Sequence, residues 1–251
     1  MCRLAYIVNK NVSSALLKDL FLTLEKSMGG DGNGIGGFID GKPVVEKEIK
    51  KTADTFVSNK AWDHGYLFHT RRASVGSIDN DNCHPFIWDN TITMHNGHID
   101  GAGVLKLMML ENIEKYAVDG WTQETLTAST DSNIMAYFIW KKGFDIVSLL
   151  SCGTVVTMYP DKTLLHAGND LEAIDVNGSW IFASEFSDAM GMAAQQWLIF
   201  AKDAEVTVMK DGKCVITKGY CVDGKKLCEE RRARAAKKNK GKRRNETVEV
   251  A

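Results

Sequence analysis

The sequence predicts an α+β protein built mostly from antiparallel sheet. Its strand-like runs come in groups, and its helical segments cluster instead of alternating with single strands. A regular strand–helix alternation would have predicted a parallel sheet. With 251 residues, of which 44% are hydrophobic, the chain can form one large domain or two small ones with a substantial core.

The first part of the chain predicts a strand, an amphipathic helix and further strands. The apolar run 4–8 is typical of a strand. Ser13 or Ser14 can cap the helix that follows, and Gly29 can end it. The helix has an apolar stripe made of Leu16, Leu17, Leu20, Phe21 and Leu24. The glycine-dense stretch 30–40 predicts a turn that leads into a strand. Two more strands, each ending in a polar cluster, are expected over 65–70 and 91–96.

The second part predicts grouped helices and then strands. Helices are expected over 103–117, over 131–143 and over 187–197. Strands are expected over 153–160, 163–168 and 179–185. A final pair over 205–217 has Asp211-Gly212 at its centre, which is a strong hairpin signal.

Composition excludes several classes of protein. No stretch approaches the roughly 20 apolar residues that a membrane span needs. The N-terminal apolar run is too short for a signal peptide and turns polar at Asn9. We therefore expect a cytoplasmic protein with no membrane contact. The six cysteines contain no CxxC pair, so we expect free thiols and no metal site.

The net charge of −1 hides an acidic body and a basic tail. Residues 225–251 hold 11 Lys or Arg against 4 Glu, or +7, and the remaining 20 basic and 28 acidic residues give −8. We expect a folded domain over 1–224 and a disordered tail over 225–251 after a short helical start. The segment 231–244 has nine basic residues in fourteen. It is either a solubilising extension or an arm for nucleic acid or an acidic partner.

The glycine-rich stretch 30–37 (GDGNGIGG) does not fit a phosphate-binding loop. No Gly-Lys-Ser/Thr follows it, and the next residues do not predict a helix. Glycine also permits a tight turn or the close approach of another backbone segment. The sequence favours that second interpretation.

Four local signals each have a structural and a functional interpretation. Cys2 is either an ordinary strand residue or, once Met1 is removed, a thiol beside a free α-amino group. Arg71, in the polar stretch 68–86, is either a surface residue or a fork for a carboxylate. Asn96-Gly97 is either a turn or an oxyanion hole. Asp131 is either a first-turn acid or a partner for an ammonium group.

Taken together, these signals resemble a known family. Cys2 followed in order by HTRRAS, NCHPF, HNGHI and TDSN resembles the glutaminase domain of class II glutamine amidotransferases, which are N-terminal-nucleophile hydrolases. GDGNGIGG and FASE (Phe182 to Glu185) are also similar to this family. The resemblance covers roughly residues 2–220. It implies a four-layer αββα sandwich with the Cys2 strand inside.

The resemblance implies a catalytic group. Cys2, exposed by removal of Met1, resembles the nucleophile, and its own α-amino group, with a pKa of about 7.7–8.0, resembles the base. Asn96 and Gly97 resemble the oxyanion hole. The implied enzyme is a glutaminase that forms a γ-glutamyl thioester and releases glutamate and ammonia. It needs no metal or organic cofactor.

The resemblance also implies how L-glutamine would be bound. Arg71 resembles the residue that holds the α-carboxylate, and Asp131 the residue that holds the α-ammonium group. Two further positions match residues that line or brace the pocket, Ser74 and His84. Arg72 and Val75 depart from the family, since some members have an aromatic residue and a histidine at these places in the loop over glutamine.

Partners and rival functions follow from the same comparison. Familiar members join this domain to a synthase or transferase domain, so we expect the ammonia acceptor on a separate partner protein. One rival is an N-terminal-cysteine amidohydrolase for another amide, which would have no reason to keep both Arg71 and Asp131. Another is a scaffold that binds nucleic acid through its basic tail, which would not need a cysteine at position 2.

Overall fold

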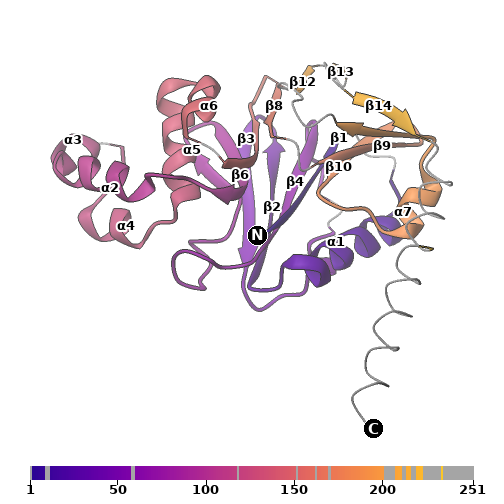
Figure 1. Ribbon diagram of the computed structural model, residues 1–251, viewed down its shortest axis with the longest axis horizontal. Coiled ribbons are helices and arrows are strands. Elements are labelled where there is room, and N and C mark those ends of the chain that lie inside the picture. The colour runs from indigo at the N-terminus through magenta and orange to yellow at the C-terminus, as the bar shows by residue number, and fades with distance from the viewer. Residues whose placement is uncertain are drawn as a thin grey trace, which may run out of the picture.

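The computed structural model describes residues 2–8, 12–57, 60–117, 119–150, 152–161, 163–168, 171–200, 207–210, 213–215, 219–222 and 233. Every pairing between the described strands is antiparallel, which confirms the predicted α+β class. The strands form two sheets (Figure 1). The eight-stranded sheet has the order β14 (Gly219–Val222), β11 (Gln196–Phe200), β9 (Glu172–Val176), β10 (Ser179–Ala183), β1 (Arg3–Val8), β4 (Gly65–Arg71), β2 (Gly32–Ile39) and β3 (Lys42–Glu48). The six-stranded sheet has the order β13 (Lys213–Val215), β12 (Thr207–Lys210), β8 (Leu164–Ala167), β7 (Cys152–Met158), β6 (Thr91–His98) and β5 (Phe86–Trp88).

The two sheets pack face to face between two helical layers. Because successive strand side chains point to opposite faces, Leu4 and Tyr6 of β1 enter the core between the sheets, where they join Met94 of β6. Ala5 and Ile7 enter the other core, under the helix α1 (Ser14–Met28). The helix α5 (Asp131–Lys142) covers the outer face of the six-stranded sheet. Figure 1 shows α1 and α5 on opposite sides of the paired sheets. This is the predicted four-layer αββα sandwich.

The helix α1 confirms the N-terminal helix prediction. The side chain of Ser13 accepts a hydrogen bond from the backbone N–H of Leu16, and Gly29 forms the C-terminal cap. The ring of Phe21 stacks on Phe68 of β4 at 3.8 Å. The buried residues of α1 are Leu17, Leu20, Phe21 and Leu24. Each such side chain contributes about 1.5–3 kcal/mol by leaving water.

The glycine-rich turn prediction over 30–40 is partly wrong, because most of this stretch is the strand β2. The expected close approach is confirmed. A Cβ atom added to Gly34 would overlap the carbonyl oxygen of His84, and one added to Gly32 would overlap the Cys83 sulfur. The glycines therefore let the segment before Phe86 lie directly on the strand.

Two helix predictions need correction. The expected helix 103–117 divides into α2 (Ala102–Leu110) and α3 (Ile113–Ala117). Its break lies at Asn112, whose N–H and side-chain amide donate to the carbonyls of Met109 and Met108 and so compete with the regular helical pattern.

The expected helix 187–197 is also too long. The helix α7 (Asp188–Ala193) ends early, and the chain turns into β11, where Trp197 is buried and donates to Glu172. The N–H of Gln195 donates to the carbonyl of Asp175 at 2.8 Å, which draws the chain onto β9. The pairing of β11 with β9 and β14 outweighs the local helical pattern here.

Several short elements have no clear signal in the sequence. They are the helices η1 (Ala53–Phe56), α4 (Gln123–Ala128), η2 (Phe144–Ile146) and α6 (Val147–Leu150), and the strands β3, β5, β9, β11 and β14. The expected strand pair at 205–217 is confirmed as β12 and β13, although its central Asp211-Gly212 lies outside the described residues. The tail, including 231–244 apart from residue 233, and the boundary at 224/225 lie outside them too.

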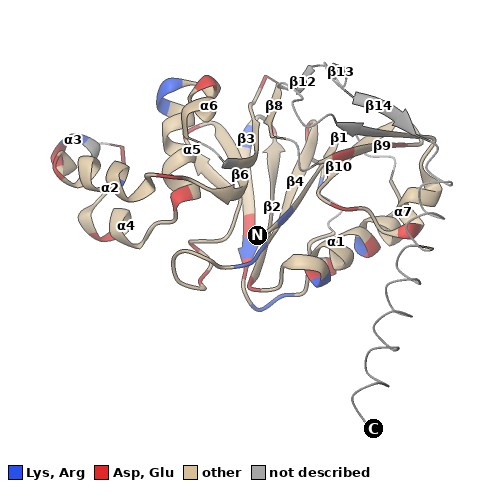
Figure 2. Cartoon of the chain, viewed as in Figure 1, with Lys and Arg blue, Asp and Glu red and all other residues tan. Residues whose placement is uncertain are grey.

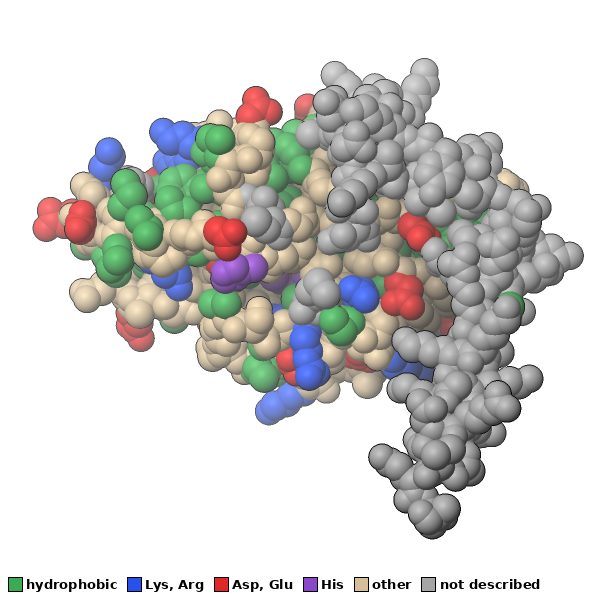
Figure 3. All heavy atoms as spheres, viewed as in Figure 1, with side chains coloured by type: hydrophobic (Ala, Val, Ile, Leu, Met, Phe, Trp, Pro, Cys, Tyr) green, Lys and Arg blue, Asp and Glu red, His purple; other side chains and the backbone are tan. Residues whose placement is uncertain are grey.

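The surface of the described residues carries both signs of charge. Figure 2 shows acidic and basic residues interspersed over the coloured ribbon instead of separated onto two faces. Exposed hydrophobic side chains gather at the α2 end of the molecule (Figure 3), and on α2 itself they are Val104, Leu107 and Met108. Among the described helices, none is both long and apolar enough to cross a membrane.

Candidate active site

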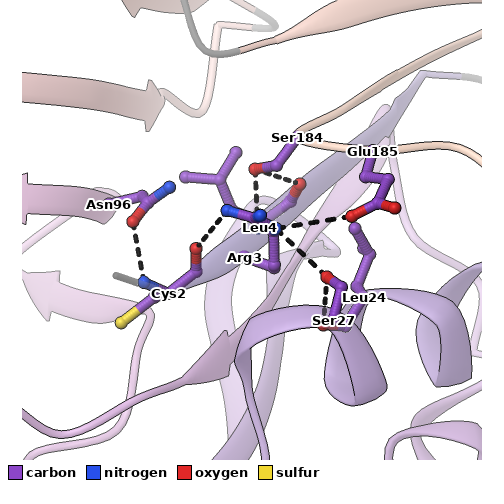
Figure 4. Close-up of polar contacts among 8 residues, drawn as sticks. All are labelled: Cys2, Arg3, Leu4, Leu24, Ser27, Asn96, Ser184 and Glu185. Atoms are coloured by element: carbon purple, nitrogen blue, oxygen red, sulfur yellow. Dashed lines mark hydrogen bonds and ion pairs between the residues drawn. The ribbon is translucent and has the colours of Figure 1, made fainter. Parts of the chain in front are cut away.

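Cys2 lies immediately before a strand that is paired along both of its edges. The following strand β1 pairs with β4 on one side and β10 on the other. Figure 4 shows the contacts between Ser184 and Leu4 next to the cysteine. The hydroxyl oxygen of Ser184 accepts from the N–H of Leu4 at 3.1 Å, and the backbone N–H of Ser184 donates to the Leu4 carbonyl at 3.0 Å. Glu185 lies 3.7 Å from the Arg3 guanidinium. The FASE segment therefore holds the N-terminal strand in place.

Two hydrogen bonds position the reactive atoms of Cys2 itself. Its backbone nitrogen donates to Asn96 Oδ1 at 2.8 Å (Figure 4). Its sulfur accepts from the backbone N–H of Arg72 at 3.2 Å. The thiol and the nitrogen of one residue are thus directed to different neighbours. This arrangement fixes the distance between a nucleophile and a nitrogen that could serve it as a base.

Burial raises the pKa of the Cys2 thiol above its ordinary value. The N–H of Arg72 and the positive charge of Arg71 act in the opposite direction, and the negative charge of Asp131 adds to the increase. The thiol is therefore mostly protonated near neutral pH. A reaction that uses it needs a base to take the proton.

Asn96 and Gly97 lie together at the end of β6 beside Cys2. Asn96 is buried, whereas Gly97 is exposed. Gly97 faces Gly153 of β7, and a Cβ atom on Gly153 would overlap the Asn96 carbonyl oxygen. Since the Asn96 amide oxygen already accepts from Cys2, its amide nitrogen is the end that can donate to a developing oxyanion.

Arg71 lies at the end of β4 and is buried. Its guanidinium donates to the carbonyl of Ser77 at 2.6 Å and to that of Val75 at 2.7 Å. The loop 72–82 therefore closes around the guanidinium. The loop is also held by Asp79, whose carboxylate accepts from the Ser77 hydroxyl and from the N–H of Asn82. Two of the five N–H groups of an arginine are used in this way, so others can bind a carboxylate.

Asp131 is the first residue of α5, after the cap residue Thr130. Its carboxylate accepts from the backbone N–H of Ile99 at 3.1 Å and from that of Ser132 at 2.8 Å. His98 Nδ1 lies 3.4 Å from the same carboxylate. Asp131 is buried and acts electrostatically on Cys2, as Arg71 does with the opposite sign. Cys2 is thus subject to the charges of one positive and one negative group.

The other two predicted pocket residues differ in their surroundings. Ser74 is exposed on the loop 72–82, so the structure does not place it in an enclosed pocket wall. His84 is buried and stacks on His69 with ring centroids 4.0 Å apart. Neither ring nitrogen of His84 has a hydrogen-bond partner within the described residues. The bracing role predicted for His84 stays a prediction, and its ring packs between His69 and Phe86.

A buried chain of histidines behind the site has no clear signal in the sequence. His69 Nε2 bonds to the carbonyl of His95 at 3.2 Å, and His95 Nδ1 bonds to Ser132 Oγ at 3.0 Å. Burial lowers the pKa of His69 to about 3 and that of His95 to about 4, and it lowers the pKa of His84 well below its usual range. These rings are therefore neutral near pH 7. They connect β4, β6 and α5 beneath Cys2.

No metal centre is evident in the part of the chain that the structure describes, since it contains no cluster of three or more His, Cys, Asp or Glu side chains that could hold an ion. Cys2 and Cys83 are both free thiols.

Comparisons with known proteins identify the class of fold. The chain has the N-terminal-nucleophile hydrolase fold, and its structural neighbours are class II glutamine amidotransferases. One neighbour is glutamine phosphoribosylpyrophosphate amidotransferase from B. subtilis in complex with ADP and GMP, with a TM-score of 0.60 and 16% identity over 86% of this chain and 49% of that one. Another is an allosteric regulatory enzyme of purine biosynthesis, with a TM-score of 0.64 and 18% identity over 86% of this chain and 49% of that one.

A third neighbour is of similar length. It is a glutamine aminotransferase class-II domain protein from Silicibacter pomeroyi, with a TM-score of 0.51 and 11% identity over 87% of this chain and 99% of that one. The chain spans about half the length of the first two neighbours. No protein-family model and no curated protein matches the sequence. At these identities the likeness concerns the fold.

Proposed function

We propose that the chain hydrolyses the side-chain amide of L-glutamine with Cys2 as nucleophile. One observation carries the proposal. The nitrogen and the sulfur of Cys2 are held by Asn96 and by the N–H of Arg72, between buried groups of opposite charge, Arg71 and Asp131. A free amino acid carries both a carboxylate and an ammonium group, so this pair of charges suits an amino-acid substrate.

The reaction would proceed in two balanced steps. The α-amino group of Cys2, free once Met1 is removed, takes the thiol proton, and the thiolate attacks the amide carbon of glutamine. A carbon–sulfur bond forms, the carbon–nitrogen bond breaks, and ammonia leaves with the proton from the amine. Water then attacks the γ-glutamyl thioester, which releases glutamate and restores the thiol. No metal or organic cofactor takes part.

Asn96 would stabilise two charges that develop during the reaction, the positive charge on the amine of Cys2 and the negative charge on the oxyanion. When the amine of Cys2 becomes an ammonium group, its hydrogen bond to Asn96 Oδ1 becomes charge-assisted and therefore stronger. The amide nitrogen of Asn96 and the N–H of Gly97 would donate to the oxyanion of the tetrahedral intermediate. Ser74 would approach the substrate from the loop, and His84 would support the wall.

We further propose that the domain spans 1–224 and supplies ammonia to an acceptor on a separate partner protein in the cytoplasm. In this proposal residues 225–251 form a disordered basic tail, and its segment 231–244 tethers the enzyme to nucleic acid or an acidic partner. Deletion of 231–244 is expected to abolish salt-sensitive retention on nucleic acid. If deletion leaves such retention unchanged, the tether is excluded.

Two alternatives remain distinct from this proposal. An amidohydrolase for another amide would need Cys2 and Asn96 but gains nothing from a buried Arg71 opposite a buried Asp131. A scaffold without activity would not need the nitrogen and sulfur of Cys2 held in separate hydrogen bonds. The geometry therefore favours glutamine hydrolysis.

The decisive experiment is the intact mass of the natively expressed protein before and after treatment with a diazoketone analogue of glutamine. We expect loss of Met1 and one covalent label, which disappears in Cys2→Ala and persists in the matched thiol control Cys83→Ala. Glutamate and ammonia should form in equal amounts. Retention of Met1 would overturn the nucleophile assignment, and a processed but unlabelled protein would favour the other-amide alternative.

A further inference from the structure

A cavity lies beside the loop 72–82, whose residues Asp79, Asp81 and Asn82 form part of its wall. It has a volume of about 540 Å³, within the range of small-molecule sites. Its walls come from β3, β5, the loop 79–82, α4 and the residues around the start of α5. The seven residues predicted for the glutamine site do not line it. The cavity is therefore separate from the proposed catalytic site.

The inner wall of the cavity is aromatic. Phe86, Trp88 and Trp121 line it, and the rings of the two tryptophans lie 5.0 Å apart with an interplanar angle of 30°. The Trp88 ring is held by a hydrogen bond from Nε1 to Asn133 Oδ1 at 2.9 Å. Flat, fixed aromatic faces bind apolar ligand bodies and attract cations.

The polar wall is acidic. Asp79, Asp81 and Glu124 line the cavity against one cation, Lys47, so three carboxylates and one ammonium group leave a formal charge of −2. Lys47 itself lies over the Phe86 ring, with its Nζ 5.1 Å from the ring centroid, and it donates to the carbonyl of Asp81 at 3.3 Å. The cavity therefore already places one ammonium group between an aromatic face and a backbone carbonyl.

We propose that this cavity binds a small organic cation, an amine with an apolar or aromatic body. The body would lie against Trp88 and Trp121, and the cationic group would face Asp81 and Glu124. A phosphate or carboxylate ligand would meet the same acidic wall and be repelled.

The cavity wall is connected to both charged groups of the proposed glutamine site. Asn82 and Asp79 of the wall hold Ser77, and the Ser77 carbonyl holds the Arg71 guanidinium. On the other side, Ser129 and Asn133 of the wall flank Asp131 in the chain. This part of the inference rests on the proposed function: a bound cation should change the KM for glutamine while leaving kcat nearly unchanged.

Binding is tested first without reference to activity, by titration of the ¹⁵N-labelled full chain followed through its indole N–H resonances. The probes are 2-phenylethylammonium, the neutral 2-phenylethanol and the anionic 3-phenylpropanoate, which share one apolar body. We expect saturable shifts of the Trp88 and Trp121 resonances, assigned with Trp88→Phe and Trp121→Phe. The cation should bind at least about 10-fold more tightly than the alcohol, and the anion should not saturate.

Charge removal at the polar wall provides the matched comparison. Asp81→Asn/Glu124→Gln should weaken cation binding about 10-fold and leave alcohol binding within about twofold. The control Glu111→Gln/Glu114→Gln removes the same charge from exposed residues that do not line the cavity, and it should change neither. Both double variants replace exposed side chains, so both should fold.

Two outcomes overturn the inference. Equal affinities for cation and alcohol would make the cavity a general apolar pocket, and no saturable shift up to about 10 mM would mean no site. If the chain hydrolyses no glutamine, the proposed function fails while the binding result still stands. If glutamine is hydrolysed with a KM that the bound cation does not alter, only the coupling fails.

Discussion

The strand that carries Cys2 and the loop that surrounds Arg71 hold their functional groups by different means. Strand β1 is buried and paired on both sides, so sheet hydrogen bonds and two hydrophobic cores fix its position. The loop 72–82 is largely exposed, and polar contacts hold it, chiefly from Arg71 and Asp79. The proposed nucleophile is thus fixed by the whole domain, whereas the group proposed to bind substrate is fixed locally.

Because the two halves of the proposed site are held by different contacts, substitutions in one half should leave the other half intact. Loss of Cys2 chemistry need not disturb the loop, because the sulfur contacts it only through the backbone N–H and carbonyl of Arg72, whereas Arg71 and Asp79 hold the loop itself. Loss of Arg71 removes the loop closure and the expected carboxylate contact together. Changes in the loop should appear mainly in KM, and changes near β1 in kcat or in stability.

The largest effect is expected from Cys2→Ala. Without the nucleophile, glutamine hydrolysis should fall by about 10³-fold or more. Because a small side chain replaces a thiol at the end of a paired strand, the thermal midpoint should stay close to that of the parent protein. Activity assays and thermal unfolding of both proteins check this. Residual activity within tenfold of the parent would refute the assignment of Cys2.

Acid should destabilise the body before it affects the loop. His69 and His95 have folded pKa values of about 3 and about 4, below the unfolded value near 6.5. The unfolded chain therefore binds more protons between those values, and stability falls as the pH drops below 6.5. From pH 7 to pH 5, each histidine should lower the free energy of unfolding by about 2 kcal/mol.

The loop should respond to acid only at a lower pH than the histidines, although the pKa of Asp79 is also shifted downward. Hydrogen bonds from Ser77 and Asn82, with a smaller effect of Arg71, outweigh burial and lower the pKa of Asp79. The contribution of Asp79 to the free energy of unfolding is therefore present above its unfolded pKa. It is lost only as the pH falls through the lower folded pKa. Thermal unfolding reports the effect of the histidines, and limited proteolysis reports the state of the loop. Each is measured at pH 7 and at pH 5. A midpoint unchanged at pH 5 would contradict the histidine argument.

Arg71→Lys should lower kcat/KM for glutamine by about 10²-fold, mainly through KM. A lysine has a single charged group and cannot hold the Val75 and Ser77 carbonyls and also bind a carboxylate in a fork. The loop should become more sensitive to proteolysis, while global stability changes little. An equal loss in kcat with unchanged KM would mean that Arg71 serves Cys2 instead of the substrate.

The smallest effect is expected from Asp79→Ala. This change removes the acceptor for the Asn82 N–H and the Ser77 hydroxyl, so the loop loosens but Arg71 stays. The KM for glutamine should rise about threefold to tenfold, with kcat unchanged. Asp54→Ala, which also removes one half-buried carboxylate but from η1, should leave KM unaltered.

The sequence predicts the class of fold and the residues that meet at the candidate site. Cys2, Arg71, Asn96 and Asp131 each end or begin an element whose pattern is readable, so their approximate meeting point follows from the fold. The helix α1 is predictable in detail because its apolar stripe and its cap at Ser13 lie in local sequence.

Other features depend on contacts between distant segments and leave no local pattern. The N–H of Arg72 that reaches Cys2 is a backbone group, and any residue would supply it. The strand β2 looks like a turn because its glycines serve the packing of His84, which lies 50 residues further along the chain. Gln196 and Trp197, the first residues of β11, fall within the expected helix because the pairing with β9 that makes them a strand leaves no local pattern.

The hydrogen bond between Cys2 and Asn96 also bears on how such a chain would be switched on. A peptide nitrogen and an amino nitrogen both donate a proton, so Asn96 Oδ1 can accept from an unprocessed or a processed chain. The domain can therefore assemble while the nitrogen of Cys2 is still an amide, which has no useful basicity. Cleavage of one peptide bond then creates an amine at the same place. The precursor would be folded but inactive. Its maturation would convert one amide nitrogen into an amine and leave the fold unchanged.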